Sequence, residues 1–129
     1  MAHNIPADLK YTKDHEWAKI EGDVAIIGIT DFAQSALGDI VFVELPEVGK
    51  TLSHHQTFGV VESIKSVSDL YSPLSGTVLE SNNDLVNAPE LCNVEPYGNA
   101  WMIKVKLNNQ SELNSLLSAS DYQNFLSSL

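Results

Sequence analysis

Short runs of apolar and β-branched residues, separated by turn residues, fill the chain from residue 17 to residue 107. Runs of this length and spacing are typical of a small barrel or sandwich of β-strands. In the last run the apolar Trp101, Ile103 and Val105 alternate with other side chains, which predicts a strand with one face in the core. The strands that we expect cover residues 16–20, 23–29, 40–45, 57–63, 76–79 and 100–107.

Helices are expected to be few and short. Thr30 and Asp31 provide an N-cap and an acidic first turn, and Gly38 provides a stop, which predicts a helix of at most two turns. In residues 111–129, leucines and aromatic residues recur every three or four positions. This spacing predicts one or two amphipathic helices, beginning near Ser111 and Ser120, that pack on the sheet.

These patterns predict a mostly β fold with small flanking helices and a C-terminal helical tail. The 129 residues, 43% of them hydrophobic, suffice for one domain with a modest core. We expect a single domain over residues 1–129, with its core at about 17–107 and its C-terminal helices at about 111–129.

The charge of the chain excludes several classes of partner. Seventeen acidic and seven basic residues give a formal net charge of −10, and all the basic residues are lysines. Nucleic-acid binding draws on clustered cations, above all on the arginine fork, so no nucleic-acid partner is expected. An anionic membrane surface would repel the chain, and no apolar run approaches the roughly 20 residues of a membrane helix.

The potential metal ligands and nucleophiles form no convincing site. Cys92 is the only cysteine, and its apolar setting is typical of a buried structural residue and not of an activated thiolate. His54 and His55 are adjacent, and in an extended segment their side chains would point to opposite sides, so we expect no metal site. The lone cysteine and a start without a targeting pattern favour a cytoplasmic protein.

The segment from residue 59 to residue 76 carries the most specific pattern. Lys65 is the only lysine between Lys50 and Lys104, and it lies in a short serine-rich turn after an apolar strand. A second strand, closed by Pro73 and Gly76, would complete a hairpin that holds the lysine amine at a rigid tip. Most lysines of this kind are simply solvated charges, so the surrounding motifs have to decide.

Those motifs resemble the H protein family of the glycine cleavage system, from about residue 11 to residue 125. They occur in the family's order and at its separations: His15-Glu16-Trp17, Ile27-Gly28-Ile29-Thr30-Asp31, Val41-Phe42-Val43-Glu44-Leu45-Pro46, Val61-Glu62-Ser63-Ile64-Lys65, Ser72-Pro73-Leu74-Ser75-Gly76, Asn93-Val94-Glu95-Pro96-Tyr97-Gly98 and Trp101-Met102-Ile103-Lys104.

The resemblance implies a carrier and not an enzyme. It implies the barrel-sandwich hybrid fold of lipoyl domains, with lipoate bound as an amide to Lys65 at the hairpin tip. The implied partners are a pyridoxal-phosphate-dependent glycine decarboxylase, a tetrahydrofolate-dependent aminomethyltransferase and an FAD-containing dihydrolipoyl dehydrogenase. The carrier would take the aminomethyl group of glycine from the first to the second, and the third would reoxidise it. A lipoyl ligase or a lipoyl/octanoyl transferase would attach the cofactor.

The resemblance also implies roles for residues near the lysine. Glu62, Ser63 and Asp69 flank Lys65 and would contribute to its recognition. A loaded arm carries an ammonium, so a cleft that receives it should contain carboxylates. Glu16 and Asp69 are our candidates for these carboxylates, and Asp14 would add to their field; the alternative is that all three only increase solubility. Four residues depart from the family pattern, namely Phe32, Ser66, Ala100 and Cys92. Because of these departures, the resemblance does not determine the shape of the cleft.

Three alternatives remain open at this point. The first is a lipoyl or biotinyl domain of another acyl-transfer complex, although Ile64-Lys65-Ser66 and the tail at residues 111–129 argue against it. The second is an H-protein-like carrier that donates or relays lipoate to other complexes. The third is a small hydrolase, for which the sequence offers no nucleophile–base pair.

Overall fold

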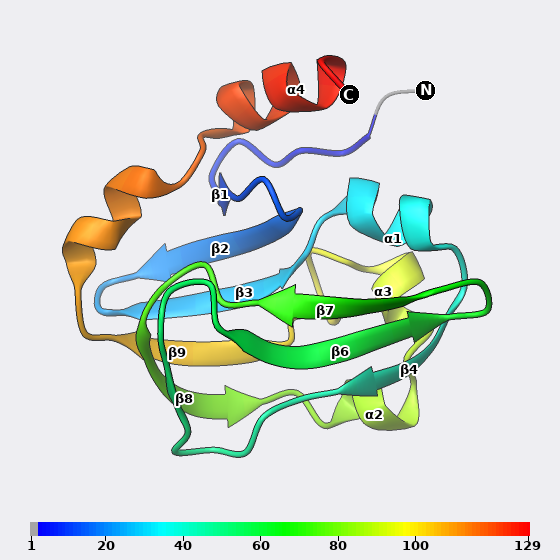
Figure 1. Ribbon diagram of the computed structural model, residues 1–129, viewed down its shortest axis with the longest axis horizontal. Coiled ribbons are helices and arrows are strands. Elements are labelled where there is room, and N and C mark those ends of the chain that lie inside the picture. The colour runs from blue at the N-terminus through cyan, green and yellow to red at the C-terminus, as the bar shows by residue number, and fades with distance from the viewer. Residues whose placement is uncertain (1–2) are drawn as a thin grey trace.

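The computed structural model describes residues 3–129 and confirms the predicted mostly β fold, with the strands of this region arranged in two antiparallel sheets (Figure 1). The larger sheet runs in the order β1 (Lys10–Tyr11), β2 (Glu16–Glu21), β3 (Val24–Ile29), β9 (Ile103–Leu107), β8 (Gly76–Ser81) and β5 (Thr51–Leu52). The smaller sheet runs in the order β4 (Ile40–Glu44), β6 (Thr57–Ser63) and β7 (Val67–Tyr71).

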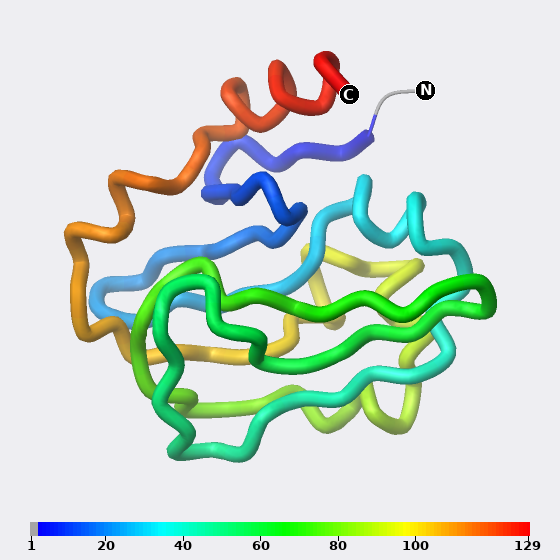
Figure 2. Tube along the Cα trace, in the orientation of Figure 1, coloured from blue at the N-terminus to red at the C-terminus, as the bar shows by residue number. Residues whose placement is uncertain are grey.

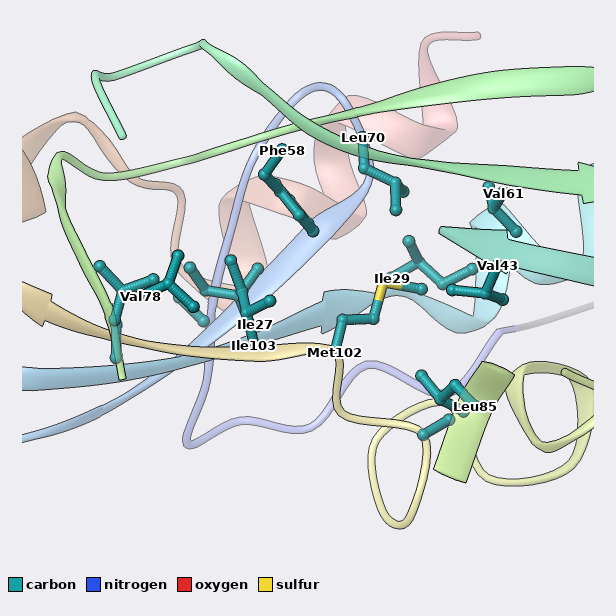
Figure 3. Packing of buried hydrophobic residues seen from close by; sticks show 14 of the residues in the cluster. Ile27, Ile29, Val43, Phe58, Val61, Leu70, Val78, Leu85, Met102 and Ile103 are labelled. Carbon is teal, nitrogen blue, oxygen red and sulfur yellow. The ribbon is translucent and has the colours of Figure 1, made fainter. Parts of the chain in front are cut away.

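The core lies between the two sheets. The apolar pairs Val43–Val61 on β4 and β6, and Ile27–Ile103 on β3 and β9, are directly opposite each other in register. Their side chains are buried and contribute to one cluster, together with Phe58, Leu70 and Met102 (Figure 3). Each buried aliphatic side chain contributes roughly 1.5–3 kcal/mol to folding. The alternation in the sequence thus creates one apolar face on each sheet, and the two faces close on each other.

The helices cover the ends and one side of the sheets. α1 (Asp31–Leu37) begins as predicted, because Thr30 Oγ1 accepts a hydrogen bond from the Ala33 amide at 3.2 Å. Two single-turn helices, α2 (Asp84–Asn87) and α3 (Leu91–Val94), follow β8 and were not predicted. The chain ends with a 3₁₀ helix (Gln110–Ser115) and α4 (Ala119–Ser127).

The two ends of the chain meet in a second apolar cluster. The rings of Tyr11 and Tyr122 stack at 4.8 Å between centroids, and the backbones of Tyr11 and Leu117 exchange two hydrogen bonds of 2.8 Å. Figure 2 shows α4 lying beside the N-terminal segment. No helix among residues 3–129 is both long enough and apolar enough to cross a membrane.

Two predicted boundaries need correction. The last helix begins at Ala119 and is capped by Ser118 and not by Ser120, because the Ser118 hydroxyl accepts a hydrogen bond from the Asp121 amide at 3.1 Å. The last strand begins at Ile103 and not at Ala100, although the Met102 amide already donates to the Ile27 carbonyl at 2.8 Å. In both cases local pattern gave the right element, and specific hydrogen bonds decided where it begins.

Candidate functional site

The β6–β7 hairpin ends in a tip formed by residues 63–66, which extends to the right edge of the molecule in Figure 1. The last strand pair before the tip is Glu62–Val67. Lys65 is exposed at this tip, and its neighbour Ile64 is 73% exposed. The hairpin therefore presents the lysine away from the core, as the sequence predicts.

Ser63 organises the backbone of the tip. Its buried hydroxyl oxygen accepts hydrogen bonds from the Lys65 amide at 3.2 Å and from the Ser66 amide at 3.1 Å. Its own amide donates to the Ser66 carbonyl at 2.8 Å. Serine side chains commonly form such local turns, because the hydroxyl replaces a backbone partner. One side chain thereby satisfies two amides of the turn and fixes the backbone that carries Lys65.

The link between α1 and β4 supports the tip from one side. The Asp39 carbonyl accepts a hydrogen bond from the Ile64 amide at 3.1 Å. Gly38 has a positive φ of 86° and lies under the lysine, so that a Cβ at this position would be 3.3 Å from Lys65 Cε. Glycine is therefore favoured at this position by its backbone conformation, and it also leaves room for the lysine stem.

Glu62 and Asp69 lie on the outer face of the smaller sheet. Glu62 is opposite Phe42 on β4 and Val67 on β7, and Asp69 is opposite Val60 on β6. Glu62 is half-buried and Asp69 is exposed. Both carboxylates thus lie on the face beside the lysine tip, on either strand of the hairpin.

Glu16 occupies a different position, where the two sheets meet. Its side chain is only 2% exposed, and its carboxyl oxygens accept hydrogen bonds from Thr12 Oγ1 at 2.9 Å and from the Tyr71 amide at 3.2 Å. Burial raises the pKa of Glu16 to about 8, although both hydrogen bonds favour the ionised form; the nearby charge of Asp14 raises it further. This carboxyl therefore joins the end of β7 to the turn before β2.

Asp14 lies in the same turn but is exposed. Its amide donates to Thr12 Oγ1 at 3.2 Å, and its carboxylate is 3.8 Å from His55 Nδ1. Thr12, Asp14, His54 and His55 line a surface hollow of about 260 Å³. The structure thus brings Asp14 close to Glu16, whereas no hydrogen bond or ion pair between side chains of residues 3–129 joins Asp69 to either of them.

His54 and His55 do not point to opposite sides, and this expectation was wrong. Their rings stack at 3.9 Å between centroids, because His55 has a positive φ of 68° and the segment turns. No group of three or more potential ligands in the described part of the chain could hold a metal ion. Cys92 is buried as predicted, and burial raises the pKa of its thiol to about 11, which leaves it unreactive.

The sequence interpretation missed the residues that support the tip from a distance. Gly38 was interpreted only as a helix stop, and neither Asp39 nor Asn93 was singled out. The Asn93 side chain makes three hydrogen bonds at and beside the α1–β4 link, to Gln34 on α1, to Gly38 and to Ile40 on β4. These contacts join residues more than 20 positions apart, so no local pattern could reveal them.

Comparison with known proteins places this geometry in a family. The family model of the glycine cleavage H-protein matches residues 9–129. The glycine cleavage system H protein of Carboxydothermus hydrogenoformans is 56% identical over 122 residues, covering 95% of this chain and 94% of that protein. The H protein of Symbiobacterium thermophilum is 57% identical over 122 residues, covering 95% of each chain.

A solved structure agrees with the sequence relatives. The crystal structure of a glycine cleavage system H protein from Mycobacterium marinum superimposes with a TM-score of 0.85 at 42% identity, covering 95% of this chain and 99% of that chain. Because the family model and the relatives match nearly the full length, and the fold matches as well, the chain belongs to the glycine cleavage system H protein family.

Proposed function

We propose that this chain is the lipoyl carrier of a glycine cleavage system, with lipoate attached as an amide to Lys65. The observation that carries the proposal is the exposed Lys65 at a hairpin tip whose backbone is held by Ser63 and Asp39. A modifying enzyme must reach the amine, and an ordered tip loses little conformational entropy when it is bound. The proteins of this family are carrier subunits and not catalytic enzymes.

The surroundings of Lys65 fit a covalently attached arm. No ion pair among residues 3–129 involves Lys65 Nζ, so its amine is available for acylation. The stem of the lysine runs over Gly38, where no side chain stands in its way. We assign Glu62 and Asp69 to the surface that a lipoyl ligase or a lipoyl/octanoyl transferase would recognise, and the buried Ser63 contributes to this recognition by fixing the shape of the turn.

The bound cofactor would supply a dithiolane whose disulfide opens to take up the aminomethyl group, and a dithiol that is afterwards reoxidised. Three enzymes are the partners in this proposal. Glycine decarboxylase with pyridoxal phosphate donates the aminomethyl group, aminomethyltransferase with tetrahydrofolate accepts it, and dihydrolipoyl dehydrogenase with FAD reoxidises the dithiol. The protein's own task is to present the arm from a fixed point. The lone, buried Cys92 is in keeping with a cytoplasmic setting for this cycle.

Glu16, Asp14 and Asp69 are the carboxyl groups that we propose for the ammonium of a loaded arm. Glu16 is suited to this role because a carboxyl with a pKa of about 8 is mostly neutral at pH 7 and ionises when a cation approaches. Docking of an ammonium beside Glu16 would therefore release a proton. Asp14 and Asp69 are exposed and would add negative potential around it.

Intact-mass analysis after incubation with lipoate, ATP and a purified lipoyl ligase tests the attachment. We expect one lipoyl group on the wild-type chain and on Lys50→Ala, which removes another exposed lysine, and none on Lys65→Ala. Modification of Lys65→Ala, or an unmodified wild-type chain, would contradict the proposal.

A glycine decarboxylation assay with the partner enzymes tests the carrier role. We expect Lys65→Arg to fold normally and to support no turnover, because a guanidinium stays protonated and does not become the amide. Turnover by this variant would contradict the role of Lys65. A wild-type chain that is lipoylated but supports no decarboxylation would instead favour a carrier that relays lipoate to other complexes.

A further inference from the structure

Asn93 lies on the single-turn helix α3, and its side chain makes three long-range hydrogen bonds to residues near the lysine tip. Its Oδ1 accepts from the Ile40 amide at 2.8 Å, and its Nδ2 donates to the Gly38 carbonyl at 2.9 Å and to Gln34 Oε1 at 3.0 Å. An asparagine amide has two N–H donors and one acceptor oxygen. All of these groups are therefore engaged, and the three partners lie on α1, on the α1–β4 link and at the start of β4.

The three bonds hold the segment that touches the tip. The Asn93 side chain forms hydrogen bonds with Gly38 and Ile40, the two neighbours of Asp39. The Asp39 carbonyl in turn accepts a hydrogen bond from the Ile64 amide. Gly38 also lies against the stem of Lys65. A side chain on α3 is thus connected to the lysine tip through a single intervening residue.

The tip depends on this support because it has a neighbour on only one side. In the described part of the chain, β7 is an edge strand of the smaller sheet, and β4 is the only strand that flanks the hairpin. The bond from the Ile64 amide to Asp39 connects the tip to the rest of the molecule at that flank. Gly38 would leave the link free to adopt many conformations, since glycine loses more backbone entropy on ordering than any other residue.

We infer that Asn93 is a positioning residue for Lys65: it fixes the α1–β4 link and so holds the lysine tip in the orientation that modifying and partner enzymes bind. This inference rests on the proposed attachment of lipoate to Lys65. The hydrogen bonds of the Asn93 side chain go to Gln34, Gly38 and Ile40 and not to the lysine side chain. Its effect passes through Gly38, Asp39 and the Ile64 amide.

The chain offers a matched control in Asn82. This buried asparagine also donates two hydrogen bonds through Nδ2, to the Asn99 carbonyl at 2.9 Å and to the Trp101 carbonyl at 2.7 Å. Its partners precede β9 and do not contact the tip. Each asparagine, when replaced by alanine, leaves at least one half-buried backbone carbonyl without this partner, of Trp101 for Asn82 and of Gly38 for Asn93, so both variants are expected to lose stability.

Amide hydrogen exchange measured by NMR tests the inference without any cofactor. In Asn93→Ala we expect the Ile64 amide to exchange at least about tenfold faster, because the link that carries its acceptor, the Asp39 carbonyl, is no longer held in one conformation. The Val61 amide, in the middle of β6, should exchange at the wild-type rate once the rates are corrected for the change in global stability. In Asn82→Ala, the Ile64 amide should also exchange at the wild-type rate after the same correction. If Ile64 exchanges alike in both variants after correction for global stability, the inference is wrong.

The kinetics of lipoylation by a purified ligase provide the second readout. We expect the KM for Asn93→Ala to rise by about tenfold with kcat nearly unchanged, because the enzyme must order the tip on binding. Asn82→Ala should resemble the wild type. If Asn93→Ala does not fold, Asn93→Asp serves, since it retains an acceptor for the Ile40 amide and loses both donors. An unmodified wild-type chain would overturn the proposed function, whereas the exchange of Ile64 would still decide the role of Asn93.

Discussion

Glu16 is a buried carboxyl group whose pKa lies well above its ordinary value. A carboxyl group at 2% exposure loses its hydration, and two hydrogen bonds only partly replace it. Its neighbour His15 shows the same effect with the opposite sign, because burial lowers the pKa of that imidazole. His15, in the turn between β1 and β2, and Glu16, at the start of β2, are therefore both mostly neutral near pH 7.

At the residue scale, the raised pKa of Glu16 predicts a specific pH dependence of stability. The folded pKa is about 8 and the ordinary value is 4.5, so the folded chain holds one more proton than the unfolded chain between these values. The free energy of unfolding must then decrease as the pH rises through this window. Glu16→Gln removes the titration and does not lose this stability. Between pH 5 and pH 9 we therefore expect the free energy of unfolding of the wild type to fall by roughly a few kcal/mol relative to that of Glu16→Gln.

Urea denaturation of the wild type and of Glu16→Gln at several pH values measures this difference. His15 contributes a slope of opposite sign below its ordinary pKa, but it is present in both proteins and cancels in the comparison. Asp14→Asn, at an exposed position of the same turn, is the control and should leave the slope largely intact. Parallel pH profiles for the wild type and Glu16→Gln would show that Glu16 does not titrate in this way.

At the scale of the element, the hairpin tip and the α1–β4 link behave as one unit. Ser63 fixes the turn from within, and Asp39 and Gly38 support it from outside. The hairpin alone would be marginally stable, since two strands in water rarely persist without further packing. The position of Lys65 is therefore a property of two elements and not of the turn sequence alone.

Gly38→Ala tests this coupling. Gly38 combines φ 86° with ψ −158°, a region that is essentially confined to glycine, so we expect a loss of roughly 1–3 kcal/mol in the free energy of unfolding. The added Cβ would also press on the Lys65 stem, and lipoylation should be slower. Gly22→Ala is the matched control: Gly22 has φ 64°, and no atom lies within 4 Å of an added Cβ. Urea denaturation and lipoylation rates should show a loss of stability in both variants and slower modification only in Gly38→Ala.

At the scale of the whole molecule, the C-terminal tail closes over the turn that carries His15 and Glu16. The hydroxyl of the fully buried Tyr122 lies 2.9 Å from His15 Nδ1 and 2.8 Å from Thr30 Oγ1, and its ring stacks on Tyr11. Burial raises the pKa of Tyr122 well above its ordinary range, so the hydroxyl keeps its proton. One side chain of α4 thereby connects the tail, the N-terminal segment and the start of α1.

Tyr122→Phe removes the hydroxyl and keeps the ring. We expect a loss of about 1–2 kcal/mol in the free energy of unfolding, because Thr30 and His15 lose a partner in a buried position. Asn124→Ala, at an exposed position of the same helix, should change stability by no more than about 0.5 kcal/mol. Chemical denaturation compares the two variants. Equal stability of Tyr122→Phe and the wild type would mean that the tail is held by apolar packing alone.

Much of the fold could be predicted because its signals are local. Alternating apolar residues located β2, β3, β4, β6, β8 and β9, and Thr30 with Gly38 located α1. The exposure of Lys65 on a hairpin tip also followed from local sequence. The stacking of His54 on His55 did not, because it depends on one positive φ in a turn. The contacts of Glu16 with Tyr71 and of Asn93 with Ile40 did not follow either, because these partners lie more than 50 residues away in the sequence.

The sequence by itself determined which lysine is presented, which strands flank it and which family the chain resembles, because turn chemistry and side-chain alternation act between neighbours. Only the tertiary structure decided what holds that lysine in place and what surrounds Glu16. Those properties arise when two sheets close on each other, which buries a carboxyl group against the end of β7 and brings Asn93 to the link beneath Lys65. Contacts of this kind depend on the path of the whole chain and not on the residues that adjoin them.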